Sequence, residues 1–226
     1  MNKKKVISDY PKEFFNEKKV FIRVDFNVPI NNDLNNIRED YRIRRSIPTI
    51  DFLINAGAKV ILGSHLGRPK GIVNSDLSLK IVSERLSELM ERPVVFCNDF
   101  KDKGWTNKFD KLPKGSVVLL ENLRFFKEET DNDSEFSKLL ASFADIYVND
   151  AFGTSHRAHA STFGMATNFK SKLAGFLVDK ELRFISKMLE QVEKPFVVII
   201  GGSKIKDKIS AMSKSVSYTH LTLPTK

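Results

Sequence analysis

The chain has 226 residues, of which 41% are hydrophobic, and its 37 Lys and Arg against 28 Asp and Glu give a formal net charge of +9. This length and composition indicate a globular protein with a substantial core, in one large domain or slightly more. The positive charge favours an anionic partner. However, the lysines are scattered and no basic stripe or nucleic-acid-binding motif occurs, so we expect no nucleic acid as partner.

The cysteine count and the N-terminal sequence indicate the cellular compartment of the protein. Cys97 is the single cysteine and cannot form an internal disulfide. A buried, inert thiol in a reducing setting is the expected state. The first residues, MNKKKVISDYPKEFF, contain no apolar signal segment, and the apolar run FVVII is far too short to span a membrane. We therefore expect a cytoplasmic protein without a membrane partner.

Short runs rich in β-branched residues alternate along the chain with segments of helical period. Strands are predicted at residues 20–25, 59–62, 94–96, 117–120, 146–148 and 196–200. Helical spacing of apolar residues predicts a helix over 79–89 behind an N-cap at Ser78, and another over 179–192 behind an N-cap at Asp179. This order predicts an α/β fold, a doubly wound and mostly parallel sheet in a Rossmann-like three-layer domain.

The same pattern predicts the domain organisation. Residues 1–178 form the first domain, and residues 179–194 form a hinge helix that leads into a second domain. Residues 195–215 supply only one strand and the start of one helix. They are the beginning of a second, similar domain.

Polar side chains follow four of the predicted strands, in the segments VDFN, GSHLGRPKG, ENLRF and VNDAFGTSHRAHAS. These side chains are Asp25, Asn27, His65, Arg68, Arg124, His156 and Arg157. Because the carboxyl ends of parallel strands meet at one edge, we expect them to converge on one crevice. The planar fork of arginine suits carboxylate and phosphate, and Asp and Asn suit hydroxyls. The sequence therefore predicts a site for a small phosphorylated hydroxy acid.

Each of these segments also has a purely structural explanation. GSHLGRPKG could be only a turn, and a single arginine after a strand is usually a solvated surface residue. His156 and His159 could be a metal pair, but no third ligand is evident, so we expect no metal site. More often such a histidine is simply hydrogen-bonded within the fold. The joint placement at strand ends is what favours a binding site.

A second candidate site lies in PFVVIIGGSKIKDKI. An apolar strand leads into Gly201 and Gly202, and Ser203 and Lys204 begin a helix whose N-terminus would face phosphate groups. Lys208 lies on the same helix face as Lys204. A tight turn with two solvated lysines is the alternative explanation and the less favoured one. Neither G-x-x-x-x-G-K-[ST] nor G-x-G-x-x-G occurs, so the common nucleotide loops, including the dinucleotide fingerprint of dehydrogenases, are absent.

Five segments together resemble the phosphoglycerate kinase family in order and spacing, from about Lys3 to Ile209. They are RVDFNVP, RIRRSIPTIDFLINAGAKVILGSHLGRPKG, LLENLRFFKEE, YVNDAFGTSHRAHAS and GGSKIKDKI. SHLGRP and NDAFGTSHRAHAS are highly specific. The resemblance implies a monomeric cytoplasmic enzyme of glycolysis. Such an enzyme transfers a phosphoryl group reversibly from 1,3-bisphosphoglycerate to Mg-ADP, giving 3-phosphoglycerate and ATP.

The resemblance also implies a role for each matching residue. Asp25 and Asn27 would hold the glycerate end of 3-phosphoglycerate, and Arg42 matches the catalytic arginine that also contacts substrate. The 3-phosphate and its neighbouring groups would be bound by His65, Arg68, Arg124 and Arg157. The phosphates of ADP or ATP, with Mg²⁺ as the cofactor, would be bound by Gly201, Gly202, Lys204 and Lys208. Lys204 would in addition follow the transferred phosphoryl group as a catalytic residue.

Two features depart from the family pattern. Family members are about twice as long, because a whole nucleotide domain follows GGSK. Residues 216–226 include Pro224, lack helical apolar spacing and look foreign to the family, so we interpret them as a non-native tail translated from sequencing-adapter DNA. We expect the parent protein to be a kinase and this chain alone to be inactive. The alternative is a non-catalytic binding module for small phosphorylated acids.

Overall fold

The computed structural model describes residues 4–31 and 36–190. By contacts the chain divides into two units, Met1–Arg183 and Phe184–Lys226. Several predicted features lie outside the described residues. They are the strand at 196–200, the second-domain start at 195–215, the tail at 216–226, and the residues Gly201, Gly202, Lys204 and Lys208.

A six-stranded sheet with the strand order β5-β6-β4-β1-β7-β8 forms the centre of the first unit. Its strands are β1 (Lys19–Val24), β4 (Lys59–Gly63), β5 (Val94–Cys97), β6 (Val117–Leu120), β7 (Ile146–Asp150) and β8 (Lys172–Ala174). Every pairing in it is parallel. The prediction of an α/β fold with a parallel sheet is therefore confirmed.

The order of the strands places a topological switch point beside β1. From β1 the chain winds to one side through β4, β5 and β6, and then crosses to β7 and β8 on the other side. In open parallel sheets, ligands bind outside the carboxyl ends of the strands at such a point. A separate antiparallel pair, β2 (Ile30–Asn31) with β3 (Asn36–Ile37), follows β1. The sequence pattern did not predict this pair or β8.

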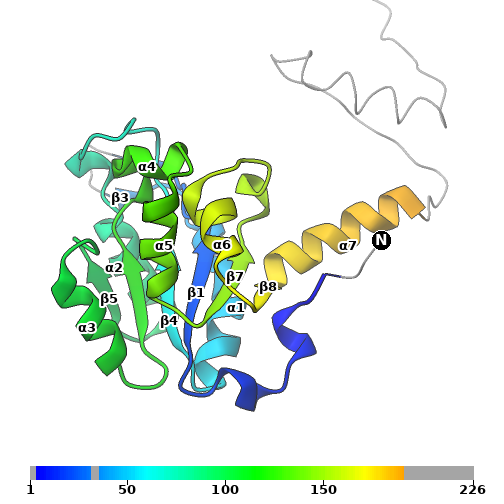
Figure 1. The fold of residues 1–226 in the computed structure, drawn as a ribbon. Helices are drawn as coiled ribbons and strands as arrows, with labels where there is room; N and C mark the ends of the chain where they lie inside the picture. The colour runs from blue at the N-terminus through cyan, green and yellow to red at the C-terminus, as the bar shows by residue number, and fades with distance from the viewer. Residues whose placement is uncertain (1–3, 32–35, 191–226) are drawn as a thin grey trace, which may run out of the picture. The chain divides into compact units, whose positions relative to one another are not determined.

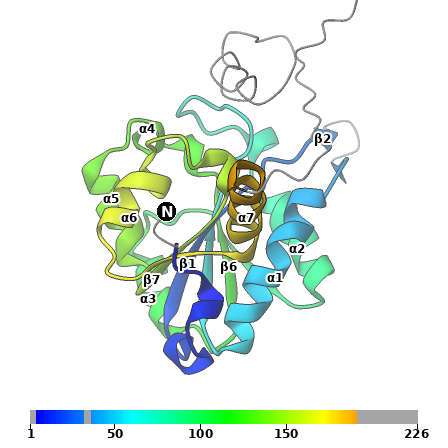
Figure 2. The same ribbon diagram turned by 90° about the vertical axis from the view of Figure 1, so that its right-hand side faces the viewer.

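Helices cover both faces of the sheet (Figures 1 and 2). The core on one face includes residues of α1 (Tyr41–Asn55), α2 (Lys80–Met90) and the start of α7 (Phe176–Glu190). The core on the other face includes residues of α3 (Lys103–Lys111), α5 (Ser134–Ser142) and α6 (Met165–Thr167). Strand β1 alternates between these cores, with Ile22 in the first and Phe21 in the second. Arg23 therefore lies on the same side as Phe21.

Short helical segments complete the unit, and several carry site residues. α4 spans Lys127–Thr130, and a π-helical turn spans Ala160–Gly164. The 3₁₀ turns span Ile7–Asp9, Lys12–Phe15, Ser75–Leu77, Leu123–Phe125 and Phe152–Thr154.

The prediction that Asp179 caps the last helix is wrong. α7 begins at Phe176, and Asp179 lies inside its first turn. The cap comes instead from Asp150 at the end of β7, whose Oδ1 accepts hydrogen bonds from the N–H groups of Leu177 at 2.9 Å and Val178 at 3.4 Å. A residue distant in sequence thus satisfies the free N–H groups of this helix, so a local cap is not needed.

Ser78, predicted as the N-cap of α2, does bind a backbone N–H of the helix start, but it shares this role with Glu121. The Ser78 hydroxyl accepts from the Lys80 N–H at 3.2 Å, and it also donates to Glu121 Oε2 at 2.7 Å. Glu121 Oε1 accepts from the Leu79 N–H at 2.8 Å. The N-cap position falls on Leu79, one residue after Ser78. A carboxylate at a helix N-terminus is favourable because of the helix dipole.

Cys97 is buried at the end of β5, as expected from the apolar run around it. Burial raises the pKa of its thiol to about 12, so this cysteine is inert at neutral pH.

Within the described part of the chain, we find no helix with the length and apolar character needed to cross a membrane.

Candidate anion-binding site

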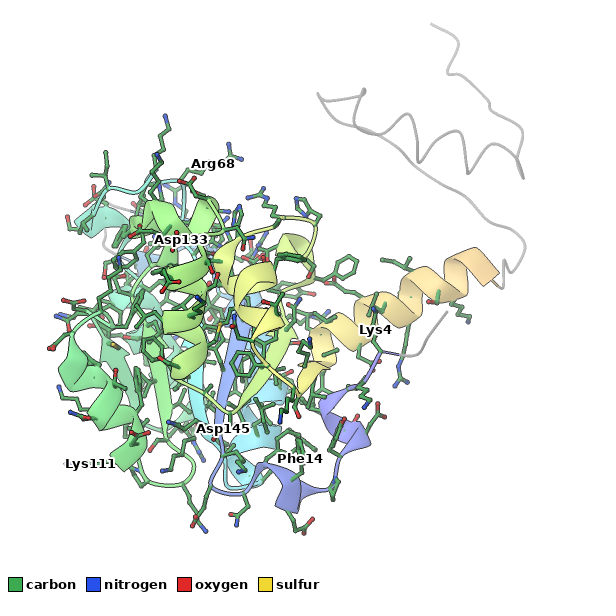
Figure 3. All side chains as sticks on the ribbon, viewed as in Figure 1. Lys4, Phe14, Arg68, Lys111, Asp133 and Asp145 are labelled. Carbon is green, nitrogen blue, oxygen red and sulfur yellow. The ribbon has the colours of Figure 1, made fainter. Side chains whose placement is uncertain are left out.

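The loops that carry the predicted site residues follow β1, β4, β6 and β7. Since these strands are parallel, the four loops emerge at one edge of the sheet. Figure 3 shows Arg68 at this edge and Asp145, which directly precedes β7, at the opposite edge.

Three arginines from three of these loops line one open pocket of about 400 Å³. They are Arg68, Arg124 and Arg157, and the other lining residues are Lys70, Lys127, Thr130 and His159. None of these residues is acidic. The pocket therefore suits an anion, and the arginines offer paired donors for phosphate or carboxylate oxygens.

Arg124 is held in place by its own loop and by the loop after β4. Its Nη1 donates to the carbonyl of Gly67 at 2.9 Å. The buried Asn122 accepts from the N–H groups of Leu66 and Arg124 at 3.2 and 3.1 Å. It also donates to the carbonyls of Leu66 and Leu77 at 2.7 and 2.9 Å. These bonds join the β4 and β6 loops, so the arginine side chain is positioned before any ligand arrives.

Asp25 and Asn27, which follow β1, and Arg42 do not line this pocket, and neither does the buried His65. Asn27 Oδ1 accepts from the N–H of Gly67 at 2.8 Å. The Asp25 carboxylate is paired with the guanidinium of Arg42, which lies in the first turn of α1 with a half-exposed side chain. Gly67 thus connects Asn27 to Arg124 through its own N–H and carbonyl groups.

The electrostatics of the site favour a bound anion. Burial, followed by the charges of Arg23, Arg124 and Arg157, lowers the pKa of His65 to about 2, so this imidazole is neutral. Burial, followed by the charges of Arg157 and Arg23, lowers the pKa of Arg124 to about 10. These cations repel one another, and an anion in the pocket would relieve the repulsion.

The two histidines of the β7 loop make contacts within the fold. His156 Nε2 lies 3.2 Å from Arg157 Nε, and His159 Nδ1 lies 3.8 Å from Glu129 Oε1. Burial lowers the pKa of His159.

The residues that the structure describes contain no group of three or more His, Cys, Asp or Glu side chains that could hold a metal ion.

The sequence reasoning missed Arg23, which is fully buried in β1. Its Nε donates to Ser161 Oγ at 2.8 Å, and its Nη2 lies 3.3 Å from His65 Nδ1. An arginine at an alternating position of an otherwise apolar strand, VFIRV, was the signal available. Lys70 and Lys127 of the pocket were also missed. Lys70 lies in the same loop after β4 as Arg68 but was not singled out there, and Lys127 begins α4.

Comparison with known proteins decides the family. Residues 10–220 match the family model of phosphoglycerate kinase. The chain belongs to the phosphoglycerate kinase family. It is 51% identical over 209 residues to the phosphoglycerate kinase of Dictyoglomus turgidum, a match over 92% of this chain and 52% of that protein. The phosphoglycerate kinase of Gloeothece citriformis is 50% identical with the same coverage. The chain thus spans about half the length of these relatives.

Solved structures give the same answer. The structure of phosphoglycerate kinase from Coxiella burnetii superimposes with a TM-score of 0.82 at 37% identity, over 96% of this chain and 53% of that one. The phosphoglycerate kinase of Pyrococcus horikoshii has a TM-score of 0.82 at 32% identity, over 94% and 52% of the two chains. The resemblance to phosphoglycerate kinases in sequence is therefore matched by their fold.

Proposed function

We propose that this chain is the substrate-binding half of a phosphoglycerate kinase and that its pocket binds 3-phosphoglycerate. The observation that carries the proposal is the pocket lined by Arg68, Arg124 and Arg157 without an acidic side chain. The 3-phosphate would be held by these arginines, with the neutral His65 beside them as a hydrogen-bonding group.

The other end of the acid would be held next to β1. Asp25 and Asn27 have oxygens suited to a hydroxyl group, and the half-exposed Arg42 is free on its outer side to face a carboxylate or a transferred phosphoryl group. Arg42 is the catalytic residue of this half. The nucleotide half of the proposal, which comprises Gly201, Gly202, Lys204, Lys208 and Mg-ADP or Mg-ATP, rests on the sequence alone.

In the whole enzyme, the proposed reaction is the glycolytic transfer from an acyl phosphate to ADP. The bond between the acyl oxygen of 1,3-bisphosphoglycerate and its phosphorus breaks, and a terminal oxygen of ADP forms the new bond to phosphorus. No enzyme nucleophile is needed. Catalysis would come from positioning and from neutralising the charge on the transferred group, which is the task of Arg42 and Lys204.

Calorimetric titration of the chain with 3-phosphoglycerate tests the binding proposal. We expect saturable binding at one site, and we expect Arg157→Ala to weaken it about thirtyfold, since a charge-assisted contact with the phosphate is lost. Arg92→Ala is the matched control, because Arg92 is exposed and precedes the amino end of β5. A wild-type chain that is folded by circular dichroism and does not bind 3-phosphoglycerate would refute the proposal.

A coupled assay for ATP formation separates an enzyme from a non-catalytic binding module for phosphorylated acids. Because the 226 residues span about half the length of the relatives, we expect the chain alone to bind the acid without turnover. Turnover at a rate typical of kinases, about 1–100 per second, would contradict this expectation.

A further inference from the structure

A buried carboxylate lies behind the basic pocket. Glu129 of α4 has 0% of its surface exposed. Its Oε2 accepts from the N–H of Ser161 at 2.9 Å, and its Oε1 accepts from the hydroxyl of Ser161 at 2.6 Å. Charged groups are buried in this way only when hydrogen bonds or opposite charges compensate them. Here the opposite charge is that of Arg23, which is linked to the carboxylate by hydrogen bonds through Ser161.

The Ser161 hydroxyl connects Glu129 to Arg23. It accepts from Arg23 Nε at 2.8 Å while its own hydrogen is donated to Glu129. Arg23 Nη1 donates to the carbonyl of Val24, which leaves Nη2 facing His65 Nδ1 at 3.3 Å. All three nitrogens of the guanidinium therefore have a partner.

The contact between Arg23 and His65 decides the tautomer of the imidazole. A guanidinium has only donors, so the ring nitrogen that it faces must accept. His65 Nδ1 therefore carries the lone pair, and the proton of the neutral ring lies on Nε2. His65 thus presents a donor, Nε2–H, on the side of the ring away from Arg23.

We propose that Glu129, acting through Ser161 and Arg23, is a positioning residue that holds His65 as the Nε2-protonated tautomer in the substrate site. Neither Glu129 nor Ser161 lines the pocket. The effect on substrate binding rests on the proposed function, whereas the effect on the tautomer does not.

The direction in which a Glu129 substitution changes anion affinity tells a positioning role from a purely electrostatic one. The negative charge of Glu129 lies near Arg124 and His159. If that charge acted only through space, removing it would strengthen the binding of an anion. If Glu129 positions Arg23 and His65, removing its charge weakens binding. Glutamine replaces one of the two accepting oxygens with an NH₂ group, which only donates and would face a donor of Ser161.

The experiment compares the full chain with Glu129→Gln, Ser161→Ala and the control Glu128→Gln. Glu128 neighbours Glu129, but its side chain is 42% exposed and is paired with Lys101 at 2.9 Å. Nitrogen NMR of the histidine rings reports the His65 tautomer without ligand, and calorimetry reports 3-phosphoglycerate binding. We expect both Glu129→Gln and Ser161→Ala to lose the single Nε2-protonated state and to bind about tenfold more weakly, and the control to match wild type.

Several outcomes would overturn the inference. One is a His65 ring that keeps its tautomer in both Glu129→Gln and Ser161→Ala, and another is binding that is unchanged or tighter in Glu129→Gln. If circular dichroism shows that Glu129→Gln does not fold, Ser161→Ala decides, since it changes no charge. If the wild-type chain does not bind 3-phosphoglycerate, the proposed function fails, and the tautomer measurement still decides the role of Glu129.

Discussion

Asp150 is a buried carboxylate at the end of β7, and its substitution by asparagine should change how stability depends on pH. Its Oδ1 caps α7, whereas its Oδ2 has no hydrogen-bond partner. Burial raises the pKa of Asp150 from 3.8 to about 6, although hydrogen bonds from Thr49, Leu177 and Val178 act in the opposite direction.

The direction of the effect follows from proton binding. The unfolded chain releases this proton near pH 3.8, whereas the folded chain keeps it until about pH 6. The ionised group therefore costs stability as the pH rises through this window, and the full cost is present above it. A rise from 3.8 to about 6 corresponds to a free energy of at most about 3 kcal/mol. Asparagine keeps the accepting oxygen and carries no charge.

We therefore expect Asp150→Asn to gain stability relative to wild type between pH 4 and 7, by up to about 3 kcal/mol. Urea unfolding followed by circular dichroism at several pH values measures this difference. Asp145→Asn is the control, because Asp145 is exposed at the opposite edge of the sheet (Figure 3). Unfolding free energies of Asp150→Asn and wild type that run parallel from pH 4 to 7 would refute the reasoning.

Two further predictions concern the core and the site. Because burial raises the pKa of Cys97 to about 12, we expect its thiol to react with an aromatic disulfide reagent slowly in the folded chain and rapidly in urea; rapid labelling without urea would contradict this. Asn122→Ala removes four hydrogen bonds to backbone groups, three of them buried, so we expect a loss of about 3 kcal/mol in urea unfolding and weaker 3-phosphoglycerate binding. An unchanged unfolding midpoint would show that these bonds are replaced by water.

The sequence predicted the strands that have enough residues to show a pattern. β4 and β6 are apolar runs bounded by glycine or polar residues, and their ends were placed within one residue. β8 spans only Lys172–Ala174, too short for any periodicity, and is held by pairing with β7. The start of α7 was misplaced because its cap, Asp150, lies 27 residues before Leu177 and is invisible to local rules.

In the site, too, some residues could be predicted from the local sequence and others depend on contacts between distant segments. Arg68, Arg124 and Arg157 could be predicted to converge because each follows a strand of a parallel sheet. Arg23 was not predicted to join them, because it lies inside β1 rather than after it, and an arginine within a strand looks structural. Its partner Ser161 lies 138 residues away, and only the folded chain brings the two together.

The two backbone hydrogen bonds of Gly67 bear on which acids the proposed site would accept. Its N–H binds Asn27 and its carbonyl binds Arg124, at opposite ends of the proposed site. The relative position of Asn27 and Arg124 is therefore fixed through the backbone of a single residue, whose bond lengths are constant. With a φ of +62° and a Cβ that would lie 2.8 Å from Leu77, the position admits glycine alone without strain. Under the proposed function this fixed arrangement would favour acids of one length, and acids one carbon shorter or longer should bind more weakly than 3-phosphoglycerate even where their charges match.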